Sequence, residues 1–449
     1  MYTNFIGWNH SLYHIIFRVA LSRKFLFILS VALILNISTL GNVAYSIPTN
    51  QCLILGCAQP TLIDPKLKVE MVATNIEGPT QMAFLDVNDI LVLERFSGMI
   101  KRITNDTLQP TPLLDVSVAA GAGERGLLGI AVSKNTEHIY VFLYYTESEV
   151  DGGNPIGNRL YRYEFVNNQL INPRLLLDLP YSPGPYHNGG SITVGADQNI
   201  YLTIGDLDNV DDKPRPNTLI QNAADGIPPN GSGGILRITQ NGDVVNDGIL
   251  GSAYPLSLYY AYGMRNSFGS GFDPVTGNLW DTENGPNYGD EINLVKPGFN
   301  SGWKKIQGIW ELTGSTGGTE LYGAPEGLVD FGGKGEYSAP EFVWKGRYGP
   351  TAIKFLASDK LGDQYKNDPF VGDIHNGFLY HFELNQTRTG FLLEGLLTDR
   401  VANDTSELEQ VILGRGFGGI TDLEVSDDGY LYIVSYIHGS IYRIVPDRK

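Results

Sequence analysis

The chain has 449 residues, of which 42% are hydrophobic, 11% aromatic and 18% charged, as in soluble globular proteins with a large core. Lysine and arginine number 32 against 49 aspartate and glutamate residues, so the formal net charge is −17. A negative field of this size repels phosphate backbones, so we expect no nucleic-acid partner. The 54 glycines and 25 tyrosines favour strands and turns over helices.

Residues 1–46 have the pattern of an export segment. Basic residues from Arg18 to Lys24 precede the apolar run "FLFILSVALIL" (25–35), and a polar stretch of small residues follows. This order is typical of a secretory signal peptide, and an uncleaved membrane anchor is the alternative interpretation. The sequence therefore predicts an extracellular or cell-surface protein that is either secreted or anchored to a membrane by its N-terminal segment alone.

Residues 47–65 are predicted to form a linker that contains both cysteines of the chain, Cys52 and Cys57. A disulfide between them suits an oxidising compartment, while the "LILGC" stretch that ends at Cys57 also resembles a lipid-attachment site. Because the remaining chain contains no cysteine, these residues are excluded as catalytic partners of the main domain.

Residues 66–449 carry one pattern six times. Strand-like runs begin with glycine and then alternate apolar and polar residues: "GMIKRI" (98–103), "GNRLYRY" (157–163), "GGILRI" (233–238), "GDEINLV" (289–295), "GFLYHF" (377–382) and "GSIYRI" (439–444). Most follow a second strand-like run, and period-two alternation between turn residues predicts antiparallel strands. Six copies predict an all-β fold, a six-bladed β-propeller with four antiparallel strands per blade. A strand from Lys66 is expected to complete the last blade.

Glycine-rich loops with polar residues adjoin several of these runs. They read "GERGLLGIAVS" (123–133), "PYHNGGSI" (185–192), "TIGDLDN" (203–209), "YGMRNSFGSGFDP" (262–274), "TENGPNYGDEINL" (282–294) and "GRYGPTAIKF" (346–355). Loops at one end of a propeller's central channel converge, so residues far apart in the sequence can meet there. The sequence therefore predicts one site assembled from these loops.

The same stretches resemble the soluble quinoprotein glucose/sorbosone dehydrogenase family. The resemblance runs from about residue 68 to 444, through "GERGLLG", "HNGG", "IGD", "GMRN", "ENGP", "GDEIN" and "GFNSGW". Members of this family have a six-bladed propeller, and the well-studied ones use pyrroloquinoline quinone (PQQ) and Ca²⁺ to oxidise sugars. The resemblance implies a dehydrogenase of an aldose or related polyol. An external electron acceptor is then needed, because the chain contains no haem-binding C-x-x-C-H motif.

The resemblance implies catalytic roles for three residues. His187 matches the general base that takes the proton from the sugar hydroxyl, a task that suits a neutral imidazole. Asp206 matches the carboxylate that orients this histidine, and Arg265 matches the cation beside the quinone oxygen. Without such a site, Asp206 would cap a turn and Arg265 would be an ordinary surface residue.

Further cofactor contacts are implied at Glu124, Asn266, Asn284, Tyr348, Thr351 and His375. Two of these depart from the family: Glu124 replaces a glutamine and His375 replaces a lysine. The family's pair of arginines falls near Gly419 and Thr421, with Arg415 close by but out of register. A trianionic cofactor that faces fewer cations should bind more weakly.

The stretch "ENGPNYGDE" (283–291) implies calcium binding. The backbone carbonyls of Gly285 and Pro286 match those that hold the cofactor-bridging Ca²⁺ in the family, and oxygen-only ligation suits a hard cation. Glu291 matches a contributor to a second, structural calcium site, and Asp290 precedes it. The alternative interpretation is an Asn-Gly-Pro turn followed by two solvated acids.

Two other functions stay open. In a calcium-dependent lactone or ester hydrolase, a metal in the channel would polarise a carbonyl while a histidine activates water. In a non-catalytic extracellular binding propeller, the scaffold would remain and the quinone would be lost. The altered basic positions favour these two hypotheses, whereas His187, Asp206 and Arg265 together favour the dehydrogenase.

Overall fold

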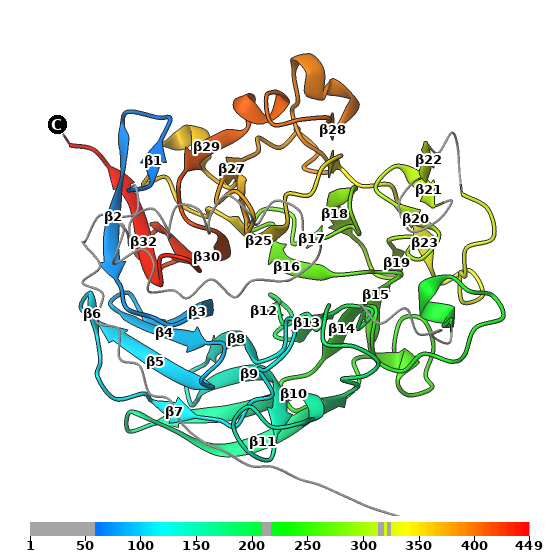
Figure 1. Cartoon of the computed structure of the whole chain (residues 1–449), viewed down its shortest axis with the longest axis horizontal. Coiled ribbons are helices and arrows are strands. Elements are labelled where there is room, and N and C mark those ends of the chain that lie inside the picture. Colours follow the sequence, from blue (N-terminus) through cyan, green and yellow to red (C-terminus); the bar gives the residue numbers. More distant parts are fainter. Residues whose placement is uncertain (1–58, 209–216, 313–317, 321–324, 449) are drawn as a thin grey trace, which may run out of the picture. The chain divides into compact units, whose positions relative to one another are not determined.

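The computed structural model describes residues 59–208, 217–312, 318–320 and 325–448 (Figure 1). The predicted export segment and both cysteines lie outside these ranges. The described residues contain β-strands and five short 3₁₀ helices: η1 (Leu219–Gln221), η2 (Leu256–Leu258), η3 (Asp363–Tyr365), η4 (Gly395–Asp399) and η5 (Glu407–Gln410). No helix in these parts of the chain combines the length and apolar character needed to cross a membrane. The prediction of an all-β fold is confirmed.

Six sheets share one plan, in which three strands consecutive within the sheet pair antiparallel. The first strands are β3 (Pro79–Asp86), β8 (Leu127–Lys134), β12 (Ile192–Val194), β16 (Ser267–Phe272), β25 (Pro350–Phe355) and β30 (Ile420–Val425). The second strands are β4 (Asp89–Glu94), β9 (Ile139–Ser148), β13 (Ile200–Ile204), β17 (Leu279–Glu283), β26 (Pro369–Asp373) and β31 (Leu431–Ser435). The third strands are β5 (Met99–Thr104), β10 (Pro155–Val166), β14 (Gly234–Ile238), β18 (Asp290–Val295), β27 (Leu379–His381) and β32 (Ser440–Pro446). Each of the six glycine-initiated runs thus supplies a third strand.

The fourth position of each sheet is filled in different ways. It is taken by β7 (Leu114–Asp115) beside β6 (Thr107–Leu108), and by β11 (Gln169–Leu179), β15 (Tyr259–Tyr262), β24 (Phe342–Trp344), β29 (Ile412–Arg415) and β2 (Leu67–Ala73). The last of these pairs antiparallel with β32, so the N-terminal and C-terminal strands lie side by side (Figure 1). The expected closing strand from Lys66 is therefore present.

Several sheets extend beyond the four strands that the repeat predicts. The sheet that ends in β15 gains two short parallel strands, β19 (Phe299–Asn300) and β23 (Glu336–Tyr337). The sheet that ends in β24 gains one, β28 (Val401–Ala402). A separate sheet contains β20 (Ile306–Gln307), β21 (Trp310–Leu312) and β22 (Gly318–Glu320). Residues 61 and 62 were expected in the linker, but they form β1 (Thr61–Leu62), which pairs with β29. Free edge groups explain these additions, because an outer strand offers unpaired N–H and C=O groups to passing segments.

The second strands do not show the alternation that half-exposed strands would have. Every residue of β13, β17 and β31 is buried. A strand whose sheet is covered on both faces has no solvent side, so apolar residues can follow one another without interruption. In β17 the same burial encloses Asp281, Thr282 and Glu283, and buried polar groups of this kind require specific partners.

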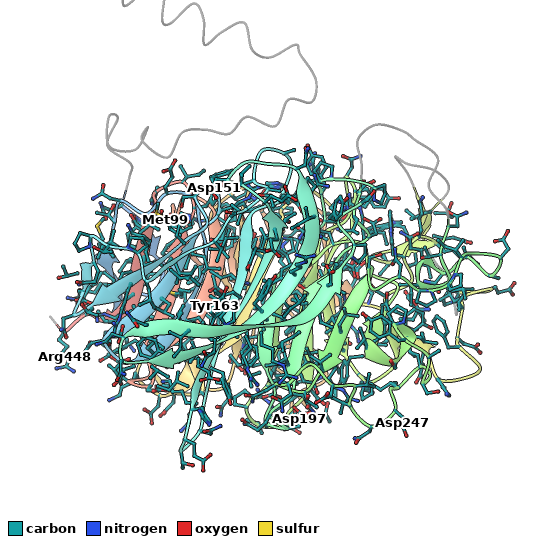
Figure 2. The ribbon with its side chains drawn as sticks, turned by 90° about the horizontal axis from the view of Figure 1, so that it is seen from below. Met99, Asp151, Tyr163, Asp197, Asp247 and Arg448 are labelled. Atoms are coloured by element: carbon teal, nitrogen blue, oxygen red, sulfur yellow. The ribbon has the colours of Figure 1, made fainter. Side chains whose placement is uncertain are left out.

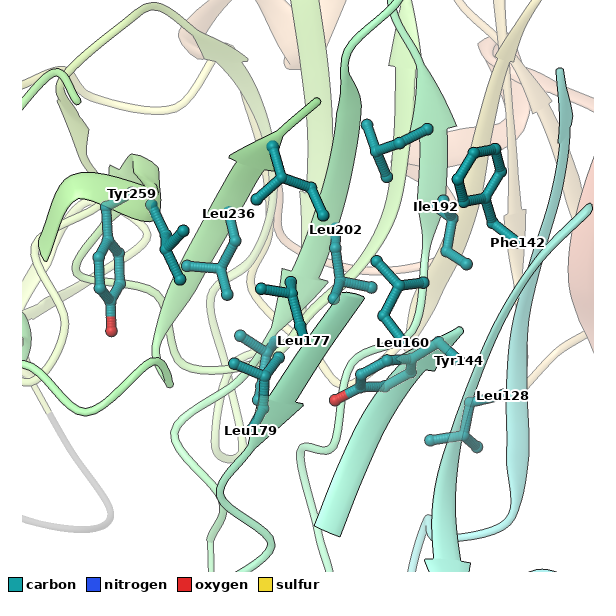
Figure 3. Close-up of a cluster of buried hydrophobic side chains, with 14 of the residues drawn as sticks. Leu128, Phe142, Tyr144, Leu160, Leu177, Leu179, Ile192, Leu202, Leu236 and Tyr259 are labelled. Atoms are coloured by element: carbon teal, nitrogen blue, oxygen red, sulfur yellow. The ribbon is translucent and has the colours of Figure 1, made fainter. Parts of the chain in front are cut away.

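Neighbouring sheets pack through apolar side chains from both. In the cluster of Figure 3, Phe142 and Leu160 of one sheet pack with Leu202 and Leu236 of the next. All four side chains are fully buried. Burial of a leucine or phenylalanine side chain contributes about 1.5–3 kcal/mol. The same cluster contains Leu128 of β8 and Ile192 of β12, so these contacts also hold two first strands and the loops at their ends.

Glu341 should make stability depend on pH. It is buried, accepts a hydrogen bond from the Leu294 backbone N–H (2.6 Å), and burial raises its pKa to about 7. Because the folded pKa exceeds the unfolded value, stability is lost as pH rises through about 7. We expect Glu341→Gln, which retains the oxygen acceptor, to stabilise the fold by about 2–3 kcal/mol at pH 8 and much less at pH 5. Urea unfolding at both pH values measures this, and an equal effect at both would contradict it.

Candidate active site

The candidate residues lie in loops at one end of the sheets. Asp151, between β9 and β10, and Asp197, between β12 and β13, lie at opposite ends (Figure 2). In an antiparallel sheet, the loop that enters the first strand and the loop that joins the second and third strands share an end. The loops before β8, β12, β16 and β25, and those after β13, β17 and β26, therefore lie at the Asp151 end. These loops carry the predicted site.

His187 and Asp206 form a buried pair. The histidine Nδ1 lies 2.6 Å from Asp206 Oδ1, and each residue is only 6% exposed. His187 has φ of 58°, an uncommon left-handed conformation for a residue other than glycine, and its backbone N–H donates to Glu124 Oε2 (2.7 Å). Glu124 thus supports the backbone that presents the imidazole. The predicted pairing of His187 with an orienting carboxylate is present in the structure.

Asp206 also binds two other segments. Trp303 donates its indole N–H to Asp206 Oδ2 (2.8 Å), and the Asp206 backbone N–H donates to the Arg265 carbonyl (2.8 Å). Burial alone would raise the pKa of Asp206, but the charge and hydrogen bond of His187, with help from Arg265 and Trp303, hold this pKa below its usual value. An ionised Asp206 must accept the Nδ1 proton, so Nε2 of His187 is left as the basic nitrogen.

Arg265 lies beside this pair. Its Nη1 donates to the carbonyls of Asn284 (2.8 Å) and Gly285 (2.9 Å), and its guanidinium lies 5.6 Å from the Trp303 ring centroid. Burial lowers the pKa of Arg265, while the carboxylates of Asp206, Glu124 and Glu283 oppose this effect. The backbone N–H of Arg265 donates to Glu283 Oε1 (2.6 Å), which fixes the start of the loop. Arg265 therefore places a cation a short distance from the histidine.

These loops surround a cavity of about 310 Å³. Ten of the predicted residues line it: Glu124, His187, Arg265, Asn266, Asn284, Gly285, Pro286, Asp290, Thr351 and His375. Asn266 is 5% exposed and its Oδ1 has no hydrogen-bond partner in the structure. Asn284 is held by its Nδ2, which donates to the Pro350 carbonyl (3.0 Å), and Thr351 Oγ1 donates to the Ile420 carbonyl (2.7 Å). The cavity therefore combines a base, a cation and an unsatisfied amide oxygen.

Three predicted residues lie outside the cavity wall, namely Asp206, Tyr348 and Glu291. Tyr348 was expected to stack on a planar ligand, but its ring belongs to a buried apolar cluster with Trp344, and its hydroxyl lies 3.0 Å from Thr405 Oγ1. Asp206 stands behind His187, as an orienting group should. The buried position of Tyr348 follows from the apolar neighbours of β24, which the local sequence does not reveal.

Asp290 and Glu291 are buried, in contrast to the alternative of two solvated acids. Asp290 accepts backbone N–H groups from Gly285, Tyr348 and Gly349, each at 2.8 Å, while burial raises its pKa. It therefore braces the loop that carries Gly285.

Glu291 lies in an oxygen-rich surrounding. It accepts from Gln307 Nε2 (2.8 Å) and from the Gly308 N–H, and burial raises its pKa. Buried oxygens of Asp281, Asn293, Gln307 and Tyr337 lack hydrogen-bond partners in the structure. In the parts of the chain that the structure describes, no group of three or more His, Cys, Asp or Glu residues is arranged to hold a metal ion.

Several residues of the site were missed in the sequence. Tyr186, Asp208, Phe268, Arg347, Gly349 and Ile374 also line the cavity. Tyr186 adjoins His187 and Arg347 lies within "GRYGPT", so proximity to a predicted residue was the available signal. Trp303 ends the "GFNSGW" motif, but its contact with Asp206 spans 97 residues and cannot be inferred from spacing.

Comparisons with known proteins identify the family of the chain. The family model for glucose/sorbosone dehydrogenases matches residues 76–443, so the chain belongs to that family. Quinoprotein glucose dehydrogenase B of Acinetobacter calcoaceticus is 28% identical over 331 residues, 68% of this chain and 67% of the relative. Aldose sugar dehydrogenase YliI of Escherichia coli K12 is 23% identical over 393 residues, 85% of this chain and 93% of the relative. The resemblance found in the motifs is confirmed.

A solved structure shows the same fold. The PQQ-bound form of aldose sugar dehydrogenase from Streptomyces coelicolor has a TM-score of 0.59 to this chain, with 22% identity. The similarity covers 87% of this chain and 99% of that one.

Trp303→Phe should destabilise the protein. The substitution keeps an aromatic ring but leaves Asp206 Oδ2 buried without its donor, which costs about 1–3 kcal/mol. Urea unfolding measures the loss. Trp310→Phe is the matched control: it makes the same substitution at an indole that packs edge-on against the Tyr288 ring, with ring centroids 5.6 Å apart, and that does not contact Asp206. Equal losses in the two variants would show that the Trp303–Asp206 contact contributes little.

Proposed function

We propose that the chain is an exported, PQQ- and calcium-dependent dehydrogenase that oxidises an aldose or related polyol. The observation that carries this proposal is the buried His187–Asp206 pair: His187 lines the same cavity as Arg265, and Asp206 holds the histidine from behind the wall. The family of the chain supports sugar oxidation, and the pattern of residues 1–46 supports export. An external electron acceptor completes the reaction, because the sequence contains no haem-binding motif.

The proposal includes a six-bladed β-propeller. The first strands contact one another in the cyclic order β3, β8, β12, β16, β25, β30 and back to β3. A closed cycle of first strands is the arrangement that radial repetition of one sheet produces. Under this interpretation, residues 66–449 form the propeller, and strands beyond the fourth position are additions at blade edges.

The cavity residues fit the quinone part of the proposed cofactor. The unpartnered Asn266 Oδ1 and the Arg265 guanidinium provide an acceptor and donors in the wall. Glu124, Asn284, Thr351 and His375 complete the predicted contacts there. When bound, the quinone supplies the group that accepts the hydride.

The chain's own residues handle the proton. His187 Nε2 takes the proton of the sugar hydroxyl, because Nδ1 is engaged by Asp206. Asp206 stabilises the imidazolium that results and prevents the ring from turning. Arg265 provides a fixed positive charge in the wall, where negative charge on a reduced ligand would develop. Burial of these groups limits screening by water, which strengthens each interaction.

Calcium would be held by oxygen atoms of the 283–291 stretch. In the proposed cavity site, the carbonyls of Gly285 and Pro286 would be ligands, and Gly285 O would be shared with Arg265 Nη1. In the proposed structural site, Glu291 and the adjacent unpartnered oxygens would be ligands, with Asp290 bracing the loop. Oxygen donors of this kind suit a hard divalent cation.

A second candidate function is a calcium-dependent hydrolase of lactones or esters. The absence of side-chain cations at Gly419 and Thr421 favours it, since a neutral ester needs no carboxylate clamp. His187 would then activate water instead of a sugar hydroxyl. Loss of both activities would leave the non-catalytic binding propeller.

The dehydrogenase proposal is tested by quinone reduction. We expect the calcium-loaded protein to bind PQQ, measured by calorimetry, and to reduce it with aldoses in a single turnover. His187→Ala should leave binding nearly unchanged and slow this step by roughly two to four orders of magnitude, the range for a lost general base. His381→Ala is the matched control, because His381 also faces a carboxylate, Asp368 (3.1 Å), but does not line the cavity. Wild-type protein that binds no PQQ would contradict the dehydrogenase, and equal rates in wild type and His187→Ala would contradict the role of His187.

Calcium should raise the melting temperature. A ligand bound only by the native state stabilises it by mass action, so chelator should lower the melting temperature and Ca²⁺ should restore it. Glu291→Gln should reduce this response, whereas Glu409→Gln, at an exposed ion pair with Arg415, should not. Superimposable melting curves in chelator and in millimolar Ca²⁺ would exclude a tight site.

A further inference from the structure

Arg347 is a cation in the cavity wall. It lies in the loop before β25, lines the cavity and is exposed. Among the described residues, its guanidinium makes no hydrogen bond or ion pair, and only its backbone carbonyl is engaged, at 3.4 Å from His375 Nδ1. The other cavity arginine, Arg265, is held by two carbonyls. Arg347 is therefore available to a ligand.

The acidic residues of the cavity are already engaged by other groups. Glu124 accepts the His187 N–H, and Asp290 accepts three backbone N–H groups. Asp208 also has an interaction within the chain. An unpaired guanidinium beside engaged carboxylates leaves a position that an anionic ligand can fill.

The positions where the family resemblance implies basic residues cannot provide this charge. Gly419 has no side chain, and a Cβ atom placed there would lie 2.8 Å from the Ile374 carbonyl oxygen and 3.1 Å from its Cδ1. Thr421 donates its hydroxyl to the Pro79 carbonyl (3.0 Å) and lines a different cavity of about 360 Å³. Ile374 lines the catalytic cavity instead. Of the positions where basic residues are implied, only His375 lines the cavity, where its Nδ1 lies 3.4 Å from the Arg347 carbonyl oxygen.

We propose that Arg347 binds a carboxylate of the ligand at this wall of the cavity, with His375 beside it. The inference rests on the proposed function and names the residue that replaces the missing basic pair. A guanidinium recognises a carboxylate through two parallel hydrogen bonds, which a histidine or a lysine cannot reproduce. The carboxylate belongs either to the quinone cofactor or to an acidic sugar such as a uronate, and the two sources are distinguishable by experiment.

The test compares Arg347→Gln and Arg347→Lys with Lys345→Gln in the full calcium-loaded protein. Lys345 is two residues away and exposed, with its Nζ near Asn403 Oδ1 (3.3 Å), so this control removes the same charge outside the cavity. Calorimetry gives Kd for PQQ, for its trimethyl ester and for glucuronate. Loss of a charged hydrogen-bond partner should raise Kd about 10-fold or more. Lysine should restore part of the affinity.

The pattern of Kd changes tells whether the bound carboxylate belongs to the cofactor or to the substrate. A rise in Kd for PQQ but not for the ester assigns the carboxylate to the cofactor. An unchanged Kd for PQQ with a raised Kd for glucuronate assigns it to the substrate. If wild-type protein binds no PQQ, the dehydrogenase proposal fails, while Arg347-dependent binding of glucuronate would still support the inference. If no carboxylate ligand binds more weakly to Arg347→Gln than to Lys345→Gln, the inference is overturned.

Discussion

The site depends on one buried carboxylate. Asp206 joins the imidazole of His187, the indole of Trp303 and the backbone carbonyl of Arg265, through contacts of 2.6 to 2.8 Å. These partners come from segments that lie far apart in the sequence. A buried charge is tolerated only when its hydrogen-bonding capacity is filled. The need to satisfy this carboxylate therefore holds the His187 and Trp303 segments against Asp206 and fixes the orientation of the imidazole, while the Asp206 backbone N–H joins the Arg265 segment.

The sheets make this convergence possible. First strands are held by apolar contacts between neighbouring sheets, and antiparallel pairing places the relevant loops at one end. The loops themselves are braced by carboxylates that accept backbone N–H groups. Glu124 holds His187, Glu283 holds Arg265, and Asp290 holds Gly285. The acidic composition thus serves structure as well as solubility, because several acids replace the hydrogen bonds that loop backbones lack.

The sequence could predict the strands that recur in every sheet. Glycine-initiated runs became third strands because the turn chemistry and hydrophobic pattern recur in each sheet. The sequence also singled out His187, Asp206 and Arg265, which the structure brings together, since each lies in a short motif beside a strand. The sequence did not reveal that the Tyr348 ring packs in a buried cluster with Trp344, because that environment is decided by tertiary packing. Trp303 was missed because its contact with Asp206 is tertiary, and Arg347 was missed because its place in the cavity wall depends on the convergence of distant loops. Short added strands such as β28 depend on free sheet edges, which local patterns do not encode.

An ionised Asp206 should fix the tautomer of His187. Nitrogen NMR of protein labelled at histidine, recorded at pH 8, measures this tautomer. We expect His187 to carry its proton on Nδ1, with Nε2 unprotonated, and we expect Asp206→Asn to abolish this preference. A His187 signal with the proton on Nε2 in the wild-type protein would show that Asp206 does not set the tautomer, because Nε2 could then accept no proton.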